Sequence, residues 1–420
     1  MSIPGRDDAT TRENSDAVPT RRGDFLIPPH AGGEVAYMAG NSLGLQPRAV
    51  ADDLAIELND WATLAVEAHV EGTHPWVDFH EFLRAPLSRL VGARETEVVA
   101  MNSLTVNLHL LMASFYQPSA SRHRIVIEDS SFPSDSYAVR SHAEFRGYNA
   151  DEAIVRLRPR EGETTLRTDD IVDLVTREGE SIALIMLGGV NYLTGQLMDI
   201  ATITAAAQSA GVVVGWDLAH AAGNVPLQLH DWNVDFAAWC SYKYLNSGPG
   251  AVAGVFVHER HLADQSIPRL SGWWSNDPSN RFEMLPTLTP VFSADAWQLS
   301  NPPILGLAPV LTSLAIFDSV GIATLRERSL RLTGYLNQLL DAHVIDRGFT
   351  VVTPSDPAAR GAQLSLDVGE RDARSVTRAL RHDHAVIADA RGEHVIRLAP
   401  VPLYCTYDDC WRVADALATM

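Results

Sequence analysis

The chain has 420 residues, a length that suits about two or three ordinary domains. Hydrophobic residues make up 46% and charged residues 20% of it, proportions that exclude collagen-like and low-complexity proteins and allow a large buried core. Asp and Glu outnumber Lys and Arg by 52 to 33, so the formal net charge is −19. This charge argues against nucleic acid and anionic membranes as partners, because both require clustered basic residues, but it leaves small anionic ligands open.

Three cysteines occur, Cys240, Cys405 and Cys410, with no C-x-x-C spacing. So sparse a set predicts neither a disulfide framework nor a metal site, and it is typical of a reducing compartment such as the cytoplasm. The polar residues 1–24 contain no apolar segment of a secretory signal, and we expect them to form a disordered arm. The uncharged stretches 181–198 and 296–317 are interrupted by polar residues or too short to span a bilayer, so we interpret both as core.

From residue 25 to about residue 300, short apolar runs alternate with helical patterns such as Thr105–Tyr116 and Ile200–Ala210. Continuous apolar strands separated by helices predict an α/β fold with a mainly parallel sheet covered on both faces. In such a sheet, ligands bind beyond the carboxyl ends of the strands. The strand candidates are Glu97–Met101, Arg124–Glu128, Ile182–Leu187 and Val212–Trp216.

The pattern changes after Phe236–Cys240. A turn-rich segment, Leu245–Gly250, leads to a further strand candidate, Ala251–His258, and together these predict a hairpin that closes the sheet.

A long helical pattern runs from residue 304 to residue 342, and Gly321 should break or kink it. Three more strand candidates follow it and predict a smaller C-terminal α+β domain. We therefore expect a large domain over residues 25–303, and a linking helix with a small domain over residues 304–420. The strand candidates are Phe349–Val352, Gln363–Leu366 and Val395–Leu398.

The phosphate-binding P-loop, the H-E-x-x-H zinc motif and a G-x-G-x-x-G after a strand are all missing from the sequence. Gly40–Gly44 does match the G-x-S-x-G of serine hydrolases, with Ser42 as the candidate nucleophile. Such an elbow normally follows several strands of the sheet, and few ordered residues precede this one. A turn or a ligand-binding loop is therefore the favoured interpretation, and a Ser42 hydrolase is an alternative.

Asp217 ends one apolar strand candidate, and Lys243 lies just beyond the next. Both side chains should project into the same crevice at the strand ends. A lysine can form a Schiff base with pyridoxal phosphate, and an aspartate can keep the pyridine nitrogen of that cofactor protonated. Two structural roles compete with this one: Asp217 as the N-cap of a helix starting at Leu218, and Lys243 as a surface residue lying over its tyrosine neighbours.

Two further segments suit the same cofactor. Asn102–Thr105 lies between a strand and a helix, where hydroxyls and free N–H groups can hold a phosphate, although ordinary capping explains it equally well. Phe132–Asp135 follows another strand and offers an aromatic face for stacking on a ring, or else a solvated turn.

Five segments together resemble the kynureninases, and the resemblance covers residues 25 to 410. It implies a pyridoxal-phosphate enzyme of fold type I, with a mainly parallel seven-stranded sheet in the large domain. The Asp217 and Lys243 pair suits many class V aminotransferase-like enzymes, whereas the first and last segments narrow the match to this family. The segments are Gly40–Pro47, Trp216–Asn224, Ser241–Asn246, Gly272–Trp274 and Ser300–Ile304.

The resemblance implies that Lys243 is the Schiff-base and catalytic residue, with Tyr242 as a candidate proton carrier. Asp217 would pair with the pyridine nitrogen, and His220 would lie beside the ring. The other implied cofactor contacts are Leu104, Thr105, Phe132, Asp135, Tyr242, Trp273 and Asn301. At Gly188 the chain departs from the family, in which we expect a hydroxyl-bearing residue near the phosphate.

In kynureninases, residues matching Trp273 and Asn301 come from the neighbouring subunit, so the resemblance implies a homodimer with shared active sites. Arg397 matches the arginine that holds the α-carboxylate of the amino-acid substrate. Ser42, His69 and Asn301 match positions around the substrate ring, and the His69 and Asn301 combination resembles members that prefer 3-hydroxykynurenine.

The implied activity is hydrolysis of L-kynurenine or its 3-hydroxy form to anthranilate or 3-hydroxyanthranilate and L-alanine. Tryptophan breakdown, NAD synthesis and a specialised product all remain open as pathways. A second class V enzyme, of the desulfurase or aminotransferase type, is the main alternative; a desulfurase requires a cysteine on a mobile loop, and neither Cys405 nor Cys410 lies in an obvious one.

Overall fold

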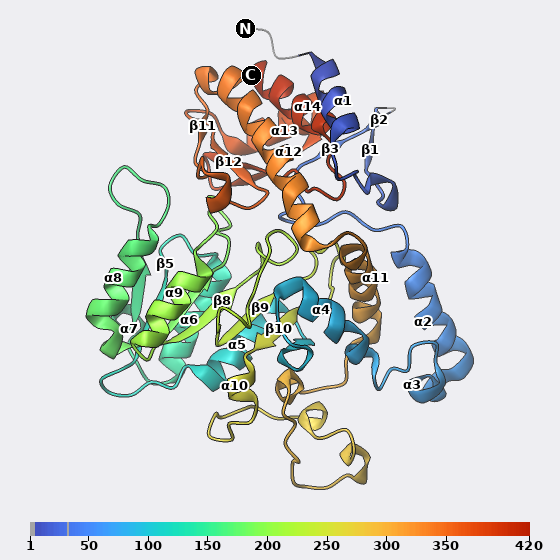
Figure 1. Ribbon diagram of the computed structural model, residues 1–420, viewed down its shortest axis with the longest axis vertical. Coiled ribbons are helices and arrows are strands. Elements are labelled where there is room, and N and C mark those ends of the chain that lie inside the picture. Colours follow the sequence, from blue (N-terminus) through green and yellow to red (C-terminus); the bar gives the residue numbers. More distant parts are fainter. Residues whose placement is uncertain (1–4, 32) are drawn as a thin grey trace.

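The computed structural model describes residues 5–31 and 33–420. At its centre is a seven-stranded sheet of order β4-β10-β9-β8-β7-β5-β6 (Figure 1). Only β10 runs antiparallel to its neighbours, so the prediction of a mainly parallel seven-stranded sheet is confirmed. The strands are β4 Val98–Ala100, β5 Arg124–Glu128, β6 Ile154–Leu157, β7 Ile182–Gly188, β8 Val213–Asp217, β9 Phe236–Trp239 and β10 Gly254–Val257.

Both faces of this sheet are buried, because alternate residues of each strand enter different hydrophobic clusters. In β5, Val126 joins one cluster, while Ile125 and Ile127 join the other. Helices α8 and α9 contribute to the first cluster, and α5 and α6 to the second. The helices around the sheet are α2 Val50–Leu64, α4 Arg84–Val91, α5 Leu104–Phe115, α6 Pro133–Phe145, α8 Thr168–Glu178 and α9 Ile200–Ser209.

The predicted hairpin is present, since β9 and β10 pair in antiparallel fashion. It does not close the sheet, however. The free edge of β10 pairs with β4, a strand from much earlier in the chain, and β4 therefore forms the edge. A pairing between segments so distant in sequence leaves no local signal at the turn.

The long helical pattern is broken as expected. Helix α11 (Ile304–Val320) ends at Gly321, whose φ of +84° favours glycine, and α12 (Ile322–His343) leaves at an angle of 79°. Among the described residues, no single helix has the length and apolar character to cross a membrane; the bent α11–α12 pair meets that test by length and composition only.

The C-terminal module is an antiparallel sheet of order β11-β12-β15-β14 that packs with helices, in the upper part of Figure 1. It matches the smaller α+β unit expected from the sequence. Its elements are β11 Thr350–Val351, β12 Leu364–Asp367, α13 Ala373–His384, β13 Val386–Ile387, β14 Asp389–Arg391, β15 Val395–Leu398 and α14 Tyr407–Ala418.

The expectation of a disordered arm over residues 1–24 is wrong for the part of it that the structure describes. Residues Arg6–Ser15 form helix α1, which packs against α14. The buried Arg328 of α12 donates to Glu13 Oε1 at 2.7 Å and to Val18 O at 2.9 Å. Asp16 pairs with Arg331 at 2.6 Å. Because these partners lie more than 300 residues away, the polar sequence of the segment gave no indication of them; residues 1–4 lie outside the described residues.

The N-terminal segment continues along the C-terminal module, where β3 (Ala36–Tyr37) pairs in parallel with β13. Helix α11, in contrast, packs against α2 and α4 beside the large sheet. The division into residues 25–303 and 304–420 therefore stays a prediction. The remaining short elements are β1 Pro29–His30, β2 Gly33–Glu34, α3 Ala68–Glu71, α7 Ala150–Ala153 and α10 Glu259–Leu262.

Candidate active site

A cavity of about 170 Å³ opens at the carboxyl ends of β5, β7 and β8. This is the edge at which an open α/β sheet binds its ligands. Its lining brings together eight of the residues expected from the sequence, and these come from four separate segments of the chain. The lining residues are Ser103, Leu104, Thr105, Glu128, Ser131, Phe132, Ser134, Asp135, Gly188, Val190, Asn191, Tyr192, Asp217, Ala219, His220, Tyr242 and Lys243.

Asp217 is the last residue of β8 and is buried at the floor of this cavity. Its Oδ1 accepts a hydrogen bond from the backbone N–H of Ala219 at 2.7 Å. No helix begins at Leu218, since residues 219–224 form turns, so the N-cap interpretation is wrong. The second carboxylate oxygen is left to face other groups in the cavity.

Three acids share this buried space. Burial raises the pKa of Asp217; burial and the neighbouring Asp217 raise the pKa of Asp135. Burial raises the pKa of Glu128 to about 7, although Asn191 and the Gly188 N–H donate to it. Carboxylates this close cannot all ionise without a compensating positive charge, so the cavity favours a cationic group beside Asp217.

Lys243 follows β9 and faces the aromatic wall of the cavity. Its Nζ lies 5.8 Å from the centroid of the Phe132 ring and 5.9 Å from that of the Tyr242 ring. Burial raises the pKa of Tyr242, so its hydroxyl keeps its proton at neutral pH. The Tyr242 carbonyl accepts a hydrogen bond from Gly44 N–H at 2.8 Å, which fastens the Gly40–Gly44 loop to the lysine segment.

His220 contributes an orphaned polar atom. The side chain is 5% exposed, and its Nδ1 has no hydrogen-bond partner among the described residues. Burial, together with the charge of Lys243, lowers the pKa of His220 well below its usual value, so the ring is neutral. A buried polar atom left unpaired in a cavity is typical of a ligand site.

The mouth of the cavity has the features of a phosphate site. Helices α5 and α6 begin beside each other, and Thr105 Oγ1 lies 2.8 Å from Ser134 Oγ. Helix N-termini present free N–H groups and a positive dipole end to an anion. With the unpaired His220 and the cation-favouring Asp217, this arrangement fits a cofactor that carries both a phosphate and a protonated ring.

Arg397, on β15, is only 1% exposed, which excludes the surface role that an edge strand would have given it. Its Nε and Nη2 donate to the two carboxylate oxygens of Asp389 at 2.7 and 2.5 Å, and its Nη1 donates to Tyr192 O at 2.8 Å. A guanidinium has five N–H groups. Nη1 and Nη2 each keep one N–H without a partner among the described residues, and a carboxylate accepts from donors of this kind.

Five expected site residues do not line the cavity of this chain: Arg397, described above, and four others. Ser42 lies in the Gly40–Gly44 turn. His69, in α3, packs edge-on against Trp76 at 5.3 Å, and α3 lies at the right-hand edge of the molecule in Figure 1. Trp273 donates to Arg281 O at 3.1 Å, and Asn301 is exposed just before α11.

The G-x-S-x-G segment does not have the surroundings of a nucleophile elbow. Its preceding strand, β3, pairs with β13 in a separate two-stranded sheet and lies outside the seven-stranded sheet. A Cβ on Gly40 would meet Tyr404 Oη at 2.2 Å, and one on Gly44 would meet Lys243 O at 2.4 Å. Close packing thus explains both glycines, with Gly40 against Tyr404 and Gly44 against the backbone of Lys243.

Sequence reasoning missed Glu128, Asn191 and Tyr192 as site residues. Glu128 could have been found, because it ends the apolar strand β5 at the same edge as Asp217. Asn191 and Tyr192 lie in an irregular loop after β7, and no local pattern singles them out.

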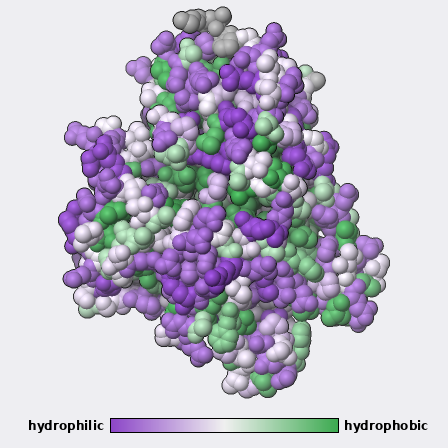
Figure 2. All heavy atoms as spheres, in the orientation of Figure 1, coloured by the Kyte–Doolittle hydropathy of each residue, from purple (hydrophilic) through white to green (hydrophobic). Residues whose placement is uncertain are grey.

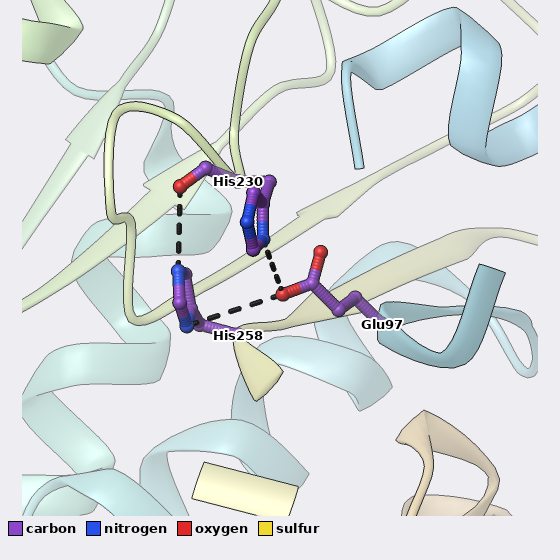
Figure 3. A group of neighbouring side chains, drawn as sticks. All are labelled: Glu97, His230 and His258. Atoms are coloured by element: carbon purple, nitrogen blue, oxygen red, sulfur yellow. Dashed lines mark hydrogen bonds and ion pairs between the residues drawn. The ribbon is translucent and has the colours of Figure 1, made fainter. Parts of the chain in front are cut away.

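A second group of titratable side chains, Glu97, His230 and His258, has the composition of a metal site (Figure 3). The two imidazoles are stacked, with centroids 5.0 Å apart and planes 9° apart, so their nitrogen lone pairs do not converge on one point. Glu97 Oε1 accepts from His230 Nδ1 at 2.9 Å and from Glu259 N–H at 2.7 Å, and Oε2 accepts from Arg94 N–H at 2.8 Å. We interpret the group as a structural junction.

The three cysteines, Cys240, Cys405 and Cys410, are all buried, and burial raises the pKa of each thiol. A buried thiol with a raised pKa is a poor nucleophile. The site therefore lacks the reactive cysteine that a desulfurase needs.

Comparison with solved structures supports the fold prediction. The cysteine desulfurase CsdA of Escherichia coli superposes with a TM-score of 0.75 at 18% identity, covering 94% of this chain and 96% of that one. A mutant of C-DES with glycine covalently linked to its PLP cofactor superposes with a TM-score of 0.75 at 16% identity, covering 91% and 96%. The chain has the fold of PLP-dependent fold type I enzymes, as expected.

Comparison with known sequences is more specific. Residues 325–417 match the family model of the kynureninase C-terminal domain. The kynureninase of Salinispora tropica is 63% identical over 405 residues, 96% of this chain and 94% of that protein. The kynureninase of Koribacter versatilis is 53% identical over 392 residues, 93% of this chain and 92% of that protein. Near full-length similarity at this level shows that the chain belongs to the kynureninase family.

Proposed function

We propose that this protein is a pyridoxal-phosphate-dependent kynureninase, a hydrolase of carbon–carbon bonds. It cleaves the Cβ–Cγ bond of L-kynurenine, or of its 3-hydroxy form, with water, and releases L-alanine and anthranilate or 3-hydroxyanthranilate. The observation that carries this proposal is the 63% identity with a kynureninase over 96% of the chain. The cavity contains the residue types that the reaction requires.

Bound pyridoxal phosphate supplies an electron sink for negative charge that forms at the substrate Cα. Lys243 would hold the cofactor through Nζ, and Asp217 would pair with its ring nitrogen. Its phosphate would lie against the N-terminus of α5, which presents Leu104 and Thr105 to the cavity. The other proposed contacts are Phe132, Asp135, His220, Tyr242, Trp273 and Asn301.

The chain's own groups then divide the proton transfers between them. Arg397 would bind the substrate α-carboxylate through the remaining N–H groups of Nη1 and Nη2, since Asp389 and Tyr192 O already hold the rest of the guanidinium. Lys243, once free, takes the proton from Cα as a general base. Water adds to the γ-carbonyl carbon, and cleavage leaves that carbon as the carboxylate of the aromatic product. Tyr242, which keeps its proton and lines the cavity, is the proposed proton donor to Cβ.

The substrate ring is proposed to contact Ser42, His69 and Asn301, with the 3-hydroxy form favoured. An imidazole and an amide can hydrogen-bond the extra hydroxyl, and a site built to do so penalises a substrate that lacks it. The test is kcat/KM for both substrates; a preference for unsubstituted kynurenine rejects this assignment.

The enzyme is proposed to act as a homodimer in which the partner supplies Trp273 and Asn301. Two observations support this: neither residue lines the cavity of its own chain, and the segment from residue 270 to residue 292 exposes many apolar side chains. This segment lies at the bottom of Figure 1, and in the same place Figure 2 shows hydrophobic residues among hydrophilic ones. The exposed side chains are Leu270, Trp273, Phe282, Met284, Leu285, Leu288 and Phe292. Light scattering after gel filtration measures the state, and a monomer with full activity contradicts it.

A cytoplasmic location suits three unpaired, buried cysteines. The pathway served, whether tryptophan breakdown, the kynurenine route to NAD or a specialised product, follows from which aromatic acid is released.

One experiment tests the function directly. Purified protein is expected to absorb between about 330 and 430 nm, where bound pyridoxal phosphate absorbs, and to release equal amounts of alanine and an aromatic acid from kynurenine. A fluorophosphonate label on Ser42 without visible absorbance would instead support a hydrolase, and sulfide release from cysteine would support a desulfurase.

A further inference from the structure

A buried amide side chain, that of Gln363, lies where three segments of the chain meet. It precedes β12, and its solvent exposure is 0%. Its Oε1 accepts a hydrogen bond from Asn41 Nδ2 at 2.7 Å. Its Nε2 donates to Tyr192 O at 3.0 Å and to Ser365 Oγ at 2.9 Å. One side chain therefore ties the Gly40–Gly44 loop, the cavity loop after β7 and the C-terminal module together.

The Gln363 amide and the Arg397 guanidinium share one hydrogen-bond acceptor. Tyr192 O accepts both from Gln363 Nε2 and from Arg397 Nη1, the latter at 2.8 Å. Ser365, the second acceptor, lies directly opposite Arg397 in the β12–β15 register and donates in turn to Leu193 O at 2.6 Å. The Tyr192 carbonyl is thus held from two sides.

Tyr192 also connects this point to the cavity. Its ring packs edge-on against Phe132 at 5.2 Å, and both residues line the cavity that contains Lys243. A shift of the Tyr192 backbone would therefore move an anchor of Arg397 and a wall of the cavity at once.

The position calls for a primary amide. It accepts from Asn41 and donates to Tyr192 O and Ser365 Oγ, and only Gln or Asn offers an oxygen acceptor and an NH₂ donor on one terminus. A glutamate would keep the contact with Asn41 but turn an oxygen toward the Tyr192 carbonyl. A methionine would fill the space without any hydrogen bond.

We propose that Gln363 is a positioning residue of the substrate-carboxylate subsite. It fixes the Tyr192 carbonyl in the place where that oxygen orients the guanidinium of Arg397, and through Asn41 it joins the Gly40–Gly44 loop to the same point. This inference rests on the proposed role of Arg397 in binding the α-carboxylate.

The test compares ligands with and without a carboxylate on the holoenzyme. Dissociation constants are measured by calorimetry and by the change in cofactor absorbance for L-alanine and ethylamine, and KM for kynurenine is measured alongside. Gln363→Met is expected to weaken the binding of L-alanine about tenfold, the usual effect of losing a buried hydrogen bond near a charged group. The binding of ethylamine is expected to weaken less than about twofold. KM is expected to rise more than kcat falls, and Gln363→Asn to recover part of the loss.

Asn224→Leu is the matched control. Asn224 is also buried at this junction; its Oδ1 accepts from Ala362 N–H at 2.9 Å and its Nδ2 donates to His220 O at 2.8 Å, but no hydrogen bond joins it to Tyr192 or Arg397 among the described residues. It is expected to leave unchanged the preference for L-alanine, measured as the dissociation constant of ethylamine divided by that of L-alanine. The inference is overturned if Asn224→Leu lowers this preference as much as Gln363→Met does. It is also overturned if Gln363→Met weakens the binding of both ligands equally.

Two further variants complete the design. Arg397→Lys should abolish the preference for L-alanine over ethylamine; if it does not, the proposed role of Arg397 is wrong. If Arg397→Lys lowers the preference and Gln363→Met does not, only the inference about Gln363 fails. Should Gln363→Met fail to fold, Gln363→Glu decides: it keeps the bond from Asn41 and must still lower the preference.

Discussion

Buried acids lie at both ends of the seven-stranded sheet, and their surroundings differ. At the amino end, burial alone would raise the pKa of Asp235, but hydrogen bonds from His261 and Arg260 outweigh that effect and lower it. At the carboxyl end, Glu128, Asp135 and Asp217 all have raised pKa values, because burial is not matched by donors. A buried acid whose hydrogen bonds offset its burial stabilises the fold. A buried acid whose hydrogen bonds do not offset its burial is typical of a ligand-binding site.

Glu97 illustrates the first kind. With His230 and His258 it has the composition of a metal site, yet three N–H groups already saturate its carboxylate. His220, a neutral imidazole at the carboxyl end, shows the same lack of partners as the acids there, since its Nδ1 has no partner among the described residues. The count of available donors and acceptors, rather than the residue types, separates the two ends.

The largest expected effect is that of Lys243→Ala. The variant loses the amine that would hold the cofactor and act as base, so turnover should fall by at least about 10³-fold. The visible absorbance of the lysine-bound cofactor should disappear with it. Circular dichroism checks that the fold is kept, and full activity in this variant would defeat the assignment.

The comparison between the sheet ends is tested most sharply by a pair of identical substitutions. Asp217→Asn is expected to lower kcat about 10²-fold with little loss of stability, because it removes one of three acids that share a cavity in which burial already raises the pKa of Asp217. Asp235→Asn is expected to cost about 2 kcal/mol in the free energy of unfolding, because an amide cannot accept all the hydrogen bonds that the buried carboxylate takes from Val214 N–H, Arg260 and His261, and to keep kcat per bound cofactor within twofold.

Urea denaturation and single-turnover kinetics measure the two quantities. The opposite result, a catalytic loss at Asp235 and a stability loss at Asp217, would remove the distinction between the two ends of the sheet.

A smaller effect is expected from pH. The pKa of Glu128 is about 7 in the folded protein and near 4.5 when exposed, so the folded state binds the extra proton between these values. Its stability contribution is present below about pH 4.5 and is lost as pH rises through 7. Relative to Glu128→Gln, the cofactor-free protein should therefore lose up to about 3 kcal/mol of stability between pH 5 and pH 8.

Thermal unfolding of both apoproteins across this range measures the difference. Glu97→Gln serves as the control, since its carboxylate is saturated. A parallel pH dependence in the protein and in Glu128→Gln would show that Glu128 ionises normally.

The smallest expected effect is that of metal removal. Because the ligand atoms of Glu97, His230 and His258 are engaged in hydrogen bonds, a chelator should leave Tm unchanged, and added zinc should shift it by less than about 1 °C. A stabilisation that depends on zinc and disappears in Glu97→Gln would contradict the structural interpretation.

Much of the large domain could be predicted from the sequence, because parallel strands buried on both faces give continuous apolar runs. The polar residues that end them, Asp217 among them, mark the cavity edge without any further information. Prediction failed where contacts join distant segments. The order of β10 and β4, the folding of α1 and the buried anchorage of Arg397 depend on partners that no local pattern identifies.

The site was predictable only in part for a second reason. His69, Trp273 and Asn301 were assigned by resemblance alone, and they lie outside the cavity of their own chain. In the proposed dimer, Trp273 and Asn301 would come from the neighbouring subunit, and such a role leaves no trace in the packing of a single chain.

The pairing of α1 with α14 and of β3 with β13 has a consequence for biosynthesis. A ribosome releases the first forty residues long before it makes their partners near residues 386 and 407, so this N-terminal segment must wait, unpaired, while the large sheet forms. The C-terminal module can be completed only when the last helix emerges. We therefore expect chains truncated before Tyr407 to expose the apolar surface beneath α14 and to be recognised by chaperones and proteases.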